Sequence, residues 1–349
     1  MNKERPWEEV EKAVLKVYKE SSPSFQDIEN SKIFEDFYKK RTNLFKKLSI
    51  PPTFMRGKKV LDIGGGTGEN LVIYANQGGL ITIVEPNEIS CKRAKELMEK
   101  NNFNIEIINQ SLYDLDPKII NSFDIVICEG VLHHTFNPLK GLNIILNNLK
   151  KDALVVVSLA ESAGYMKREL QREFVRNKGN NKKDEIIKIA KQYFQEHLDK
   201  AVKYGLRKEI NIIFDTYINP QIKTSSLEDI CDVFFKNRVE YHSSYPRLAS
   251  FFETLSWRNY HENPFNYNYY KNYYKQLEKI WAVSGSKDED ENHADIDLSK
   301  FLNLVEKNYQ ELIDLKEKIK TNNCYDEDLK LLQKGYLGIG LHHFAGVKK

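Results

Sequence analysis

The chain has 349 residues, of which 41% are apolar, so it is long enough for one large domain or for a domain with sizeable additions around a buried core. Its 53 Lys and Arg residues against 50 Asp and Glu residues leave a net charge of only +3. A charge this small argues against a strong attraction to nucleic acid or to a membrane surface.

The cysteines and the apolar runs indicate the cellular environment. The four cysteines show neither a Cys-x-x-Cys pair nor a paired histidine spacing, so we expect reduced thiols and no metal site. The N-terminus is charged, and the longest apolar run, Ala153 to Ala160, is too short to span a membrane. These features predict a cytoplasmic protein without a membrane partner.

Two amphipathic helices are expected before the first strand, within segment 1–57. Apolar residues repeat at helical spacing from Trp7 to Tyr18 and again from Phe34 to Phe45. A proline pair, Pro51-Pro52, then ends the second helix.

The stretch Lys58–Asn70 combines a strand, a glycine turn and a helix start. A β-branched apolar run that contains Asp62 predicts a buried parallel strand, which ends at the turn Gly64-Gly65-Gly66. Bare amide groups below a helix N-terminus can approach a nucleotide closely. A dinucleotide site would have glycine where this chain has Glu69, and Asp62 suits a ligand ammonium better than a phosphate. The residues therefore favour S-adenosylmethionine, which carries an amino group and a sulfonium.

Val60 to Asn70 resembles the first motif of the class I S-adenosylmethionine-dependent methyltransferases, written xLDxGxGxG. The resemblance is to the UbiE-like group (methyltransferase type 11). It implies an α/β fold with a seven-stranded, mostly parallel, doubly wound (Rossmann-like) sheet. It also implies that segment 1–57 forms a helical lid, in which Tyr38 or Arg41 faces the donor or belongs to an ordinary docking face.

The second strand, Leu80 to Val84, ends in Glu85-Pro86, about twenty residues after Asp62. A carboxylate at this position can accept hydrogen bonds from both ribose hydroxyls. Glu85 is therefore the expected ribose ligand.

The turns after the third and fourth strands supply the remaining donor contacts. Relatives often place Gly-Asp after the third strand, Ile105 to Ile108, and the resemblance implies that Ser111 or the Leu112 backbone takes that place near the adenine. The fourth strand, Ser122 to Cys128, leads into a turn that resembles the one beneath the methionyl group in this family. The expected donor contacts are Asp62, Gly64, Gly65, Gly66, Glu85, Pro86, Ser111, Leu112, Glu129 and Gly130.

Two adjacent histidines, His133 and His134, follow that turn. Histidine can change its charge near neutral pH, so His134 is a candidate general base that takes a proton from the attacking nucleophile. The alternative is a hydrogen-bonded structural histidine. Because the sulfonium is already activated, methyl transfer can also proceed by in-line positioning and water exclusion alone.

The fifth strand, Ala153 to Ala160, ends the expected donor-binding core at 58–160, and a helical insertion follows at 161–224. This insertion is rich in Lys and Arg, which indicates solvated helix faces or an anionic substrate. It ends with an Asp-x-Tyr-x-x-Pro elbow similar to elbows that border the acceptor pocket in some UbiE-like enzymes. Asp215 and Tyr217 are therefore candidate acceptor contacts.

The rest of the chain is expected to complete the sheet around a second insertion. Segment 225–245 predicts the last core helix and the sixth strand, and 246–334 predicts an aromatic-rich helical cap. Segment 335–349, with strand character from Tyr336 to Val347, predicts a seventh, antiparallel strand.

Together these features predict an enzyme that methylates an O, N or C nucleophile of a small or medium-sized molecule. Two alternatives stay open: an RNA or protein acceptor, suggested by the basic insertion and the aromatic tract, and a donor-binding protein without turnover. A nucleic-acid partner is not favoured, and the sequence leaves the oligomeric state open.

Overall fold

The computed structural model describes residues 6–21, 26–249, 261–284, 298–333 and 340–349. These residues form two compact units. Unit 1 comprises Met1–Ala160, Pro220–Tyr270 and His342–Lys349, and unit 2 comprises Glu161–Asn219 and Lys271–Leu341. The two insertions that we predicted as separate segments thus share unit 2 for most of their length.

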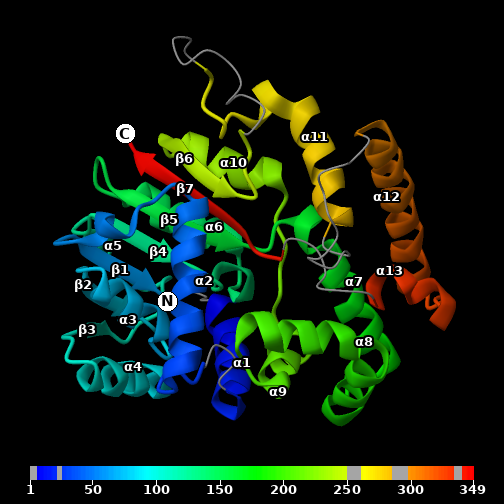
Figure 1. The fold of residues 1–349 in the computed structure, drawn as a ribbon, viewed down its shortest axis with the longest axis horizontal. Helices are drawn as coiled ribbons and strands as arrows, with labels where there is room; N and C mark the ends of the chain where they lie inside the picture. The colour runs from blue at the N-terminus through cyan, green and yellow to red at the C-terminus, as the bar shows by residue number, and fades with distance from the viewer. Residues whose placement is uncertain (1–5, 22–25, 250–260, 285–297, 334–339) are drawn as a thin grey trace, which may run out of the picture. The chain divides into compact units, whose positions relative to one another are not determined.

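Unit 1 is built on a seven-stranded sheet in the order β3-β2-β1-β4-β5-β7-β6. The strands are β1 Lys59–Ile63, β2 Leu80–Val84, β3 Glu106–Ile108, β4 Ile125–Cys128, β5 Leu154–Leu159, β6 Val239–Tyr245 and β7 His342–Lys348. Strands β1 to β5 pair in parallel, whereas β7, red in Figure 1, lies between β5 and β6 and is antiparallel to both. The predicted doubly wound α/β sheet is therefore confirmed.

The continuous apolar runs of the sequence form the centre of this sheet. Every residue of β4 and β5 is buried, as expected for parallel strands that are covered on both faces. The fourth strand begins at Ile125, later than predicted, because residues 122–124 form a turn and a bend. The seventh begins at His342, and the predicted strand residues 336–339 lie outside the described part of the chain.

Helices pack on both faces of the sheet. In unit 1 they are α1 Pro6–Glu20, α2 Ser31–Lys47, α3 Glu69–Asn76, α4 Glu88–Lys100, α5 Pro117–Ile120, α6 Pro138–Asn147 and α10 Leu227–Lys236. Neighbouring residues of β7 point to opposite faces. His343 lies 3.3 Å from Glu129, which also binds Arg41 of α2, whereas the Phe344 ring lies 5.9 Å from that of Phe234 on α10. Helices α2 and α10 thus cover opposite faces.

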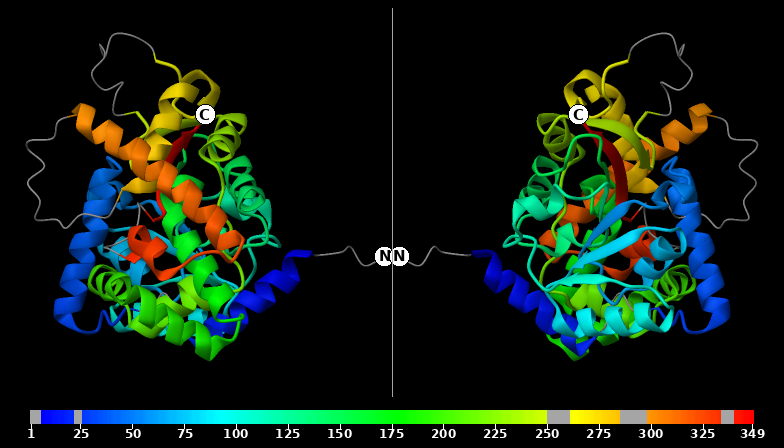
Figure 2. Two further views of the ribbon diagram at one scale, coloured as in Figure 1. Left: turned by 90° about the vertical axis from the view of Figure 1, so that its right-hand side faces the viewer. Right: turned by 90° about the vertical axis from the view of Figure 1, so that its left-hand side faces the viewer.

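Unit 2 is helical and has a core of its own. Its helices are α7 Ser162–Lys178, α8 Lys183–Gly205, α9 Glu209–Ile213, α12 Leu298–Lys320 and α13 Lys330–Gln333, together with most of α11 Tyr267–Val283. Figure 2 shows α12 in orange beside α7 in green, in agreement with their contacts. Leu170, Phe194 and Leu312, from three different helices, belong to one buried cluster.

Two predicted features of the cap fall partly or wholly outside the described residues. Phe251, Phe252, Trp257 and Tyr260 of the aromatic tract lie there, as does the acidic stretch 286–297. The tract's described tyrosines, from Tyr267 to Tyr274, lie on α11. None of the described helices is both long and apolar enough to cross a membrane.

Candidate functional site

The glycine turn lies at the point where the strand order of the sheet reverses. Strand β1 pairs with β2 on one side and with β4 on the other. The connection after β1 therefore leads toward one edge of the sheet, and the connection after β4 leads toward the other edge. In open α/β sheets, ligands bind at the carboxyl ends of the strands at such a switch point. Asp62 near the end of β1, Glu85 after β2 and Glu129 after β4 all lie there.

The turn itself requires glycine. Gly64 and Gly66 have φ values of +74° and +58°, in the left-handed region that side chains rarely adopt. A Cβ atom at Gly64 would lie 2.4 Å from Cγ2 of Val131, and one at Gly65 would lie 2.8 Å from Cδ1 of Ile83. The turn after β1 can pack this closely against Val131 and Ile83 only because these side chains are missing.

Glu69, which occupies the position of the third glycine in a dinucleotide site, is buried and hydrogen-bonded within the protein. Its Oε2 accepts a hydrogen bond from Thr67 Oγ1 at 2.6 Å, and its Oε1 accepts one from the Gln26 amide at 3.4 Å. Glu69 thus ties the glycine turn to the segment between α1 and α2.

Asp62 is an almost fully buried carboxylate whose Oδ2 has no hydrogen-bond partner among the described residues. Burial raises the pKa of Asp62 to about 8, and the negative charge of Glu129 adds to this rise, while Arg41 opposes it. An unsatisfied buried acceptor is costly for a folded protein. A ligand ammonium at this position would satisfy it.

Glu85 is also buried, but both of its carboxylate oxygens are hydrogen-bonded. Oε2 accepts from the Gly66 amide at 3.1 Å and Oε1 from the Asn87 amide at 2.9 Å. Burial raises the pKa of Glu85 to about 7 against these two bonds. Each oxygen keeps a second acceptor position, so the carboxylate is held in place and can still accept from ribose hydroxyls. Pro86, next in the chain, is half-buried.

Glu129 lies in a network formed by three other elements. It accepts hydrogen bonds from Arg41 of α2 and, at 3.2 Å, from the hydroxyl of Tyr74 on α3, and His343 of β7 lies 3.3 Å away. Burial raises the pKa of Glu129, but the charge of Arg41 and the bond to His343 outweigh it and hold the pKa well below its usual range. Next to it, the Gly130 amide donates to Ser158 Oγ at 2.8 Å.

The loop after β3 is covered by α1. Ser111, expected to face the adenine, donates its hydroxyl proton to Glu11 Oε2 at 2.6 Å. Trp7 stacks on Tyr113 with 5.7 Å between the ring centroids. Leu112, the other expected contact in this loop, is buried. The first helix therefore lies over the loop that was expected to hold the base.

His134 lies in a short 3-10 helix, Leu132–His134, that follows β4. Its Nδ1 is 2.8 Å from the carbonyl oxygen of Gln221, and its ring packs edge-on against Tyr18 of α1. The carbonyl can only accept, so Nδ1 carries the proton in this contact and Nε2 holds the lone pair of the neutral ring. This tautomer is the one that a base acting through Nε2 requires.

The two candidate acceptor contacts of the elbow lie in unit 2, in a π-helix, Phe214–Ile218. Tyr217 has no exposed surface, and its hydroxyl donates to Gln171 Oε1 at 3.0 Å inside the core of unit 2. A side chain buried in this way cannot touch an acceptor, so the expectation for Tyr217 was wrong. Asp215 forms an ion pair with Arg207 at 3.1 Å.

Several basic residues of the first insertion are engaged inside unit 2. Arg172 donates to the carbonyl oxygens of Thr216, at 2.8 Å, and Asn219. Lys178 lies 4.8 Å from the centre of the Tyr193 ring. These cations stabilise the π-helix and the helix packing. The basic composition of this segment is therefore not by itself evidence of a surface that binds nucleic acid.

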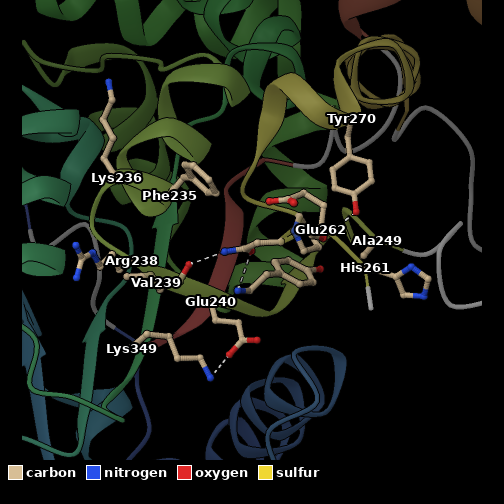
Figure 3. Close-up of a pocket in the computed structure, with 13 residues that line it drawn as sticks. Phe235, Lys236, Arg238, Val239, Glu240, Ala249, His261, Glu262, Tyr270 and Lys349 are labelled. Atoms are coloured by element: carbon tan, nitrogen blue, oxygen red, sulfur yellow. Dashed lines mark hydrogen bonds and ion pairs between the residues drawn. The ribbon is translucent and has the colours of Figure 1, made fainter. Parts of the chain in front are cut away.

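Unit 1 also contains a hollow of about 820 Å³ away from this site (Figure 3). It is lined by Phe235, Val239 and Tyr270 among others, and Val239 is the first residue of β6. Strand β6 runs in the same direction as β5, so its start lies at the edge of the sheet opposite to the glycine turn. Polar groups drawn in Figure 3 bond to one another, as Lys349 does to Glu240.

No sequence pattern pointed to Glu11, Tyr74 or His343, and Arg41 was open to two interpretations. Glu11 and Ser111 are 100 residues apart, and Arg41 and Glu129 are 88 apart. No local pattern connects such positions. A signal that could have pointed to Glu11 is the absence of an acid directly after the third strand, where relatives often have Asp.

Comparison with known proteins supports the resemblance. Residues 55–209 match the sequence model of a family described as Methyltransferase domain, as the motif at Val60 to Asn70 predicted. A ubiquinone biosynthesis O-methyltransferase of Glaesserella parasuis is 34% identical over 106 residues, which cover 29% of this chain and 45% of that protein. The match thus spans less than half of the curated relative's length.

Several solved structures are similar at low identity. PKMT2 from Rickettsia typhi in complex with AdoHcy is 14% identical, with a TM-score of 0.47 over 88% of this chain and 52% of that one. The magnesium protoporphyrin IX methyltransferase of Synechocystis PCC 6803 with bound SAM is also 14% identical, with a TM-score of 0.36 over 60% of this chain and 72% of that one.

Proposed function

We propose that this chain, whose residues 55–209 match the model of a methyltransferase domain, transfers the methyl group of S-adenosylmethionine to an O, N or C nucleophile of a small or medium-sized molecule. One observation carries the proposal: a glycine turn and the buried carboxylates Asp62 and Glu85 converge at the switch point of the sheet. Asp62 Oδ2 has no hydrogen-bond partner among the described residues, and the turn packs too closely on Val131 and Ile83 to admit side chains at Gly64 and Gly65.

The residues of this site match the donor group by group. Asp62 would accept hydrogen bonds from the ammonium of the methionyl part, and Glu85 would accept from the ribose hydroxyls. The backbone at Gly64 and Gly66 would lie against the middle of the ligand, and Glu129 with Gly130 would border its methionyl end. Bound S-adenosylmethionine supplies an electrophilic methyl group on a positively charged sulfur. The protein's own work is to position this group in line with the nucleophile and to exclude water.

His134 is proposed as the group that takes the proton of the nucleophile. Its Nδ1 bond to the Gln221 carbonyl places the lone pair of the neutral ring on Nε2. A positioned general base contributes about 10²- to 10⁴-fold to a rate. His134→Ala should therefore lower kcat by about that factor. His261→Ala, at an exposed position, is the control. Equal turnover of both variants from pH 6 to 9 would remove the base from the mechanism.

The acceptor class is tested by labelling. Calorimetry with S-adenosylmethionine comes first, followed by incubation of the protein and methyl-tritiated donor with a cell extract. The extract is then separated into small molecules, RNA and protein. We expect label in the small-molecule fraction. Label in RNA or protein instead would contradict the acceptor class, and binding without formation of S-adenosylhomocysteine would contradict turnover.

A further inference from the structure

The position of the ribose ligand determines where the base of the donor must lie. Glu85 follows β2, and β3 lies beyond β2 at the edge of the sheet. A nucleoside whose ribose is held at Glu85, and whose other end reaches the turn at Gly64, therefore extends its base toward the loop after β3. That loop contains Ser111 and Leu112.

No acid follows β3 directly, but one reaches this loop from α1. The Glu11 carboxylate accepts a hydrogen bond from Ser111 Oγ at 2.6 Å. Burial raises the pKa of Glu11, the Ser111 bond lowers it, and Asp114 and Glu8 raise it again. Glu11 is also among the charges that, after burial, raise the pKa of Glu85 to about 7, so the two carboxylates lie near each other.

We propose that Glu11 recognises the adenine ring of the donor by accepting a hydrogen bond from its exocyclic amino group. The inference rests on the proposed function, because it assumes that S-adenosylmethionine binds at Glu85. A carboxylate is an acceptor with about four lone-pair positions, so the bond from Ser111 leaves capacity for an amino group. A base with a 6-oxo group in place of the amine presents an acceptor to Glu11 and is repelled.

Ser111 is a positioning residue in this arrangement. Its hydroxyl donates to Glu11, and it accepts at 3.3 Å from the Tyr113 amide, so it links the carboxylate to the loop. The stack of Trp7 on Tyr113 holds the start of α1 on the same loop. Helix α1 thus contributes a specificity-determining side chain as well as a cover.

The test compares two ligands that differ only at the base, S-adenosylhomocysteine and S-inosylhomocysteine, by titration calorimetry. The wild-type protein should prefer the adenosyl compound by about tenfold or more, the effect of one hydrogen bond of about 1.4 kcal/mol. Glu11→Gln should reduce this preference about tenfold, because its amide can donate to a 6-oxo group. Ser111→Ala should reduce it less, and Glu9→Gln, which removes the same charge at an exposed position of α1, should leave it unchanged.

The preference is a ratio, so it does not depend on the fraction of each variant that is folded. If wild type and Glu11→Gln bind S-adenosylhomocysteine with the same preference, the role of Glu11 is overturned while the proposed function stands. If the wild-type protein binds neither compound, the proposed function itself is overturned.

Discussion

At the scale of single residues, the site holds three buried carboxylates in different charge environments. Burial raises the pKa of Asp62 to about 8 and that of Glu85 to about 7, whereas Arg41 and His343 overcome the burial of Glu129 and lower its pKa. Glu129 is thus already paired within the protein. Asp62 remains the acid that gains most from a cationic ligand.

Glu85 should carry a large share of donor affinity. Glu85→Ala removes the proposed ribose acceptor, and losing charge-assisted hydrogen bonds costs about 1.5–3 kcal/mol of binding free energy. Calorimetry with S-adenosylmethionine measures this loss. Glu88→Ala, three residues later and exposed on α4, is the matched control. Equal affinity of the two variants would overturn the ribose assignment.

Asp62 should make folding stability depend on pH. Its folded pKa of about 8 lies above the unfolded value of about 3.9. Between these values the folded protein keeps a proton that the unfolded chain loses, so the contribution of Asp62 to stability falls as pH rises from about 4 to 8. Asp62→Asn lacks this titration. The free energy of unfolding of Asp62→Asn, relative to that of the wild type, should therefore rise by at least about 1 kcal/mol between pH 5 and pH 8.

Urea unfolding at both pH values measures this difference. Asp36→Asn, at a partly exposed position of α2, should show no such gain. Parallel pH dependence of Asp62→Asn and wild type would contradict the assigned charge state of Asp62.

Residue positions were predictable from sequence where they depend on local geometry. Asp62 and Glu85 follow from strand ends, so their position at the sheet edge could be expected. Tyr217 could not be judged in this way, because an Asp-x-Tyr-x-x-Pro pattern carries no information on burial. Its packing against Gln171 depends on residues 46 positions away.

At the scale of elements, the turn after β1 depends on the absence of side chains. Gly57 and Gly64 have similar φ values, +69° and +74°, but a Cβ at Gly57 meets nothing within 4 Å, whereas one at Gly64 meets Val131 at 2.4 Å. Alanine at either position should cost about 1 kcal/mol of stability for the left-handed backbone. Gly64→Ala should cost about 1–3 kcal/mol more for the overlap.

Thermal unfolding and donor titration of the two variants test this difference. Adding Val131→Ala to Gly64→Ala should recover part of the lost stability, because it removes the overlapping methyl groups. Equal stability of Gly57→Ala and Gly64→Ala would contradict the packing described for the turn.

Strands were easier to predict than the contacts of the first helix. The apolar runs predicted β1, β2 and β5 within one or two residues, because parallel strands that are covered on both faces are mostly apolar. The periodicity of α1 predicted a helix but not that Glu11 reaches Ser111. That contact arises from packing between elements, which periodicity does not encode.

At the scale of the molecule, the C-terminal strand β7 lies inside the sheet of unit 1 and not at its edge. β7 pairs with β5 along one side and with β6 along the other. A chain that ends at Leu341 would leave β5 and β6 without their shared neighbour. It would also expose the rings of Phe234 and Phe265, against which the buried Phe344 packs. We expect this truncation to abolish cooperative unfolding, as measured by circular dichroism.

Removal of Lys349 alone is the control for this truncation, because its side chain is exposed and forms a surface ion pair with Glu240. It should unfold like the full chain. Cooperative unfolding of the chain that ends at Leu341 would show that the sheet does not need β7.

The division into two units was only partly predictable. The segments 161–224 and 246–334 were each expected to be helical, and their described residues are mainly so. That α7, α8 and α12 share one apolar cluster depends on long-range packing. The sequence therefore predicted the strands of the sheet well and the organisation of the added helices poorly.

The central claim is that S-adenosylmethionine binds at the carboxyl ends of β1, β2 and β4. A crystal structure of the protein with S-adenosylhomocysteine tests it most directly. We predict a ligand above Gly64 to Gly66, with its ribose hydroxyls on Glu85 and its amino group on Asp62. A ligand bound elsewhere, or a crystal saturated with the compound and without density at this turn, would contradict the account.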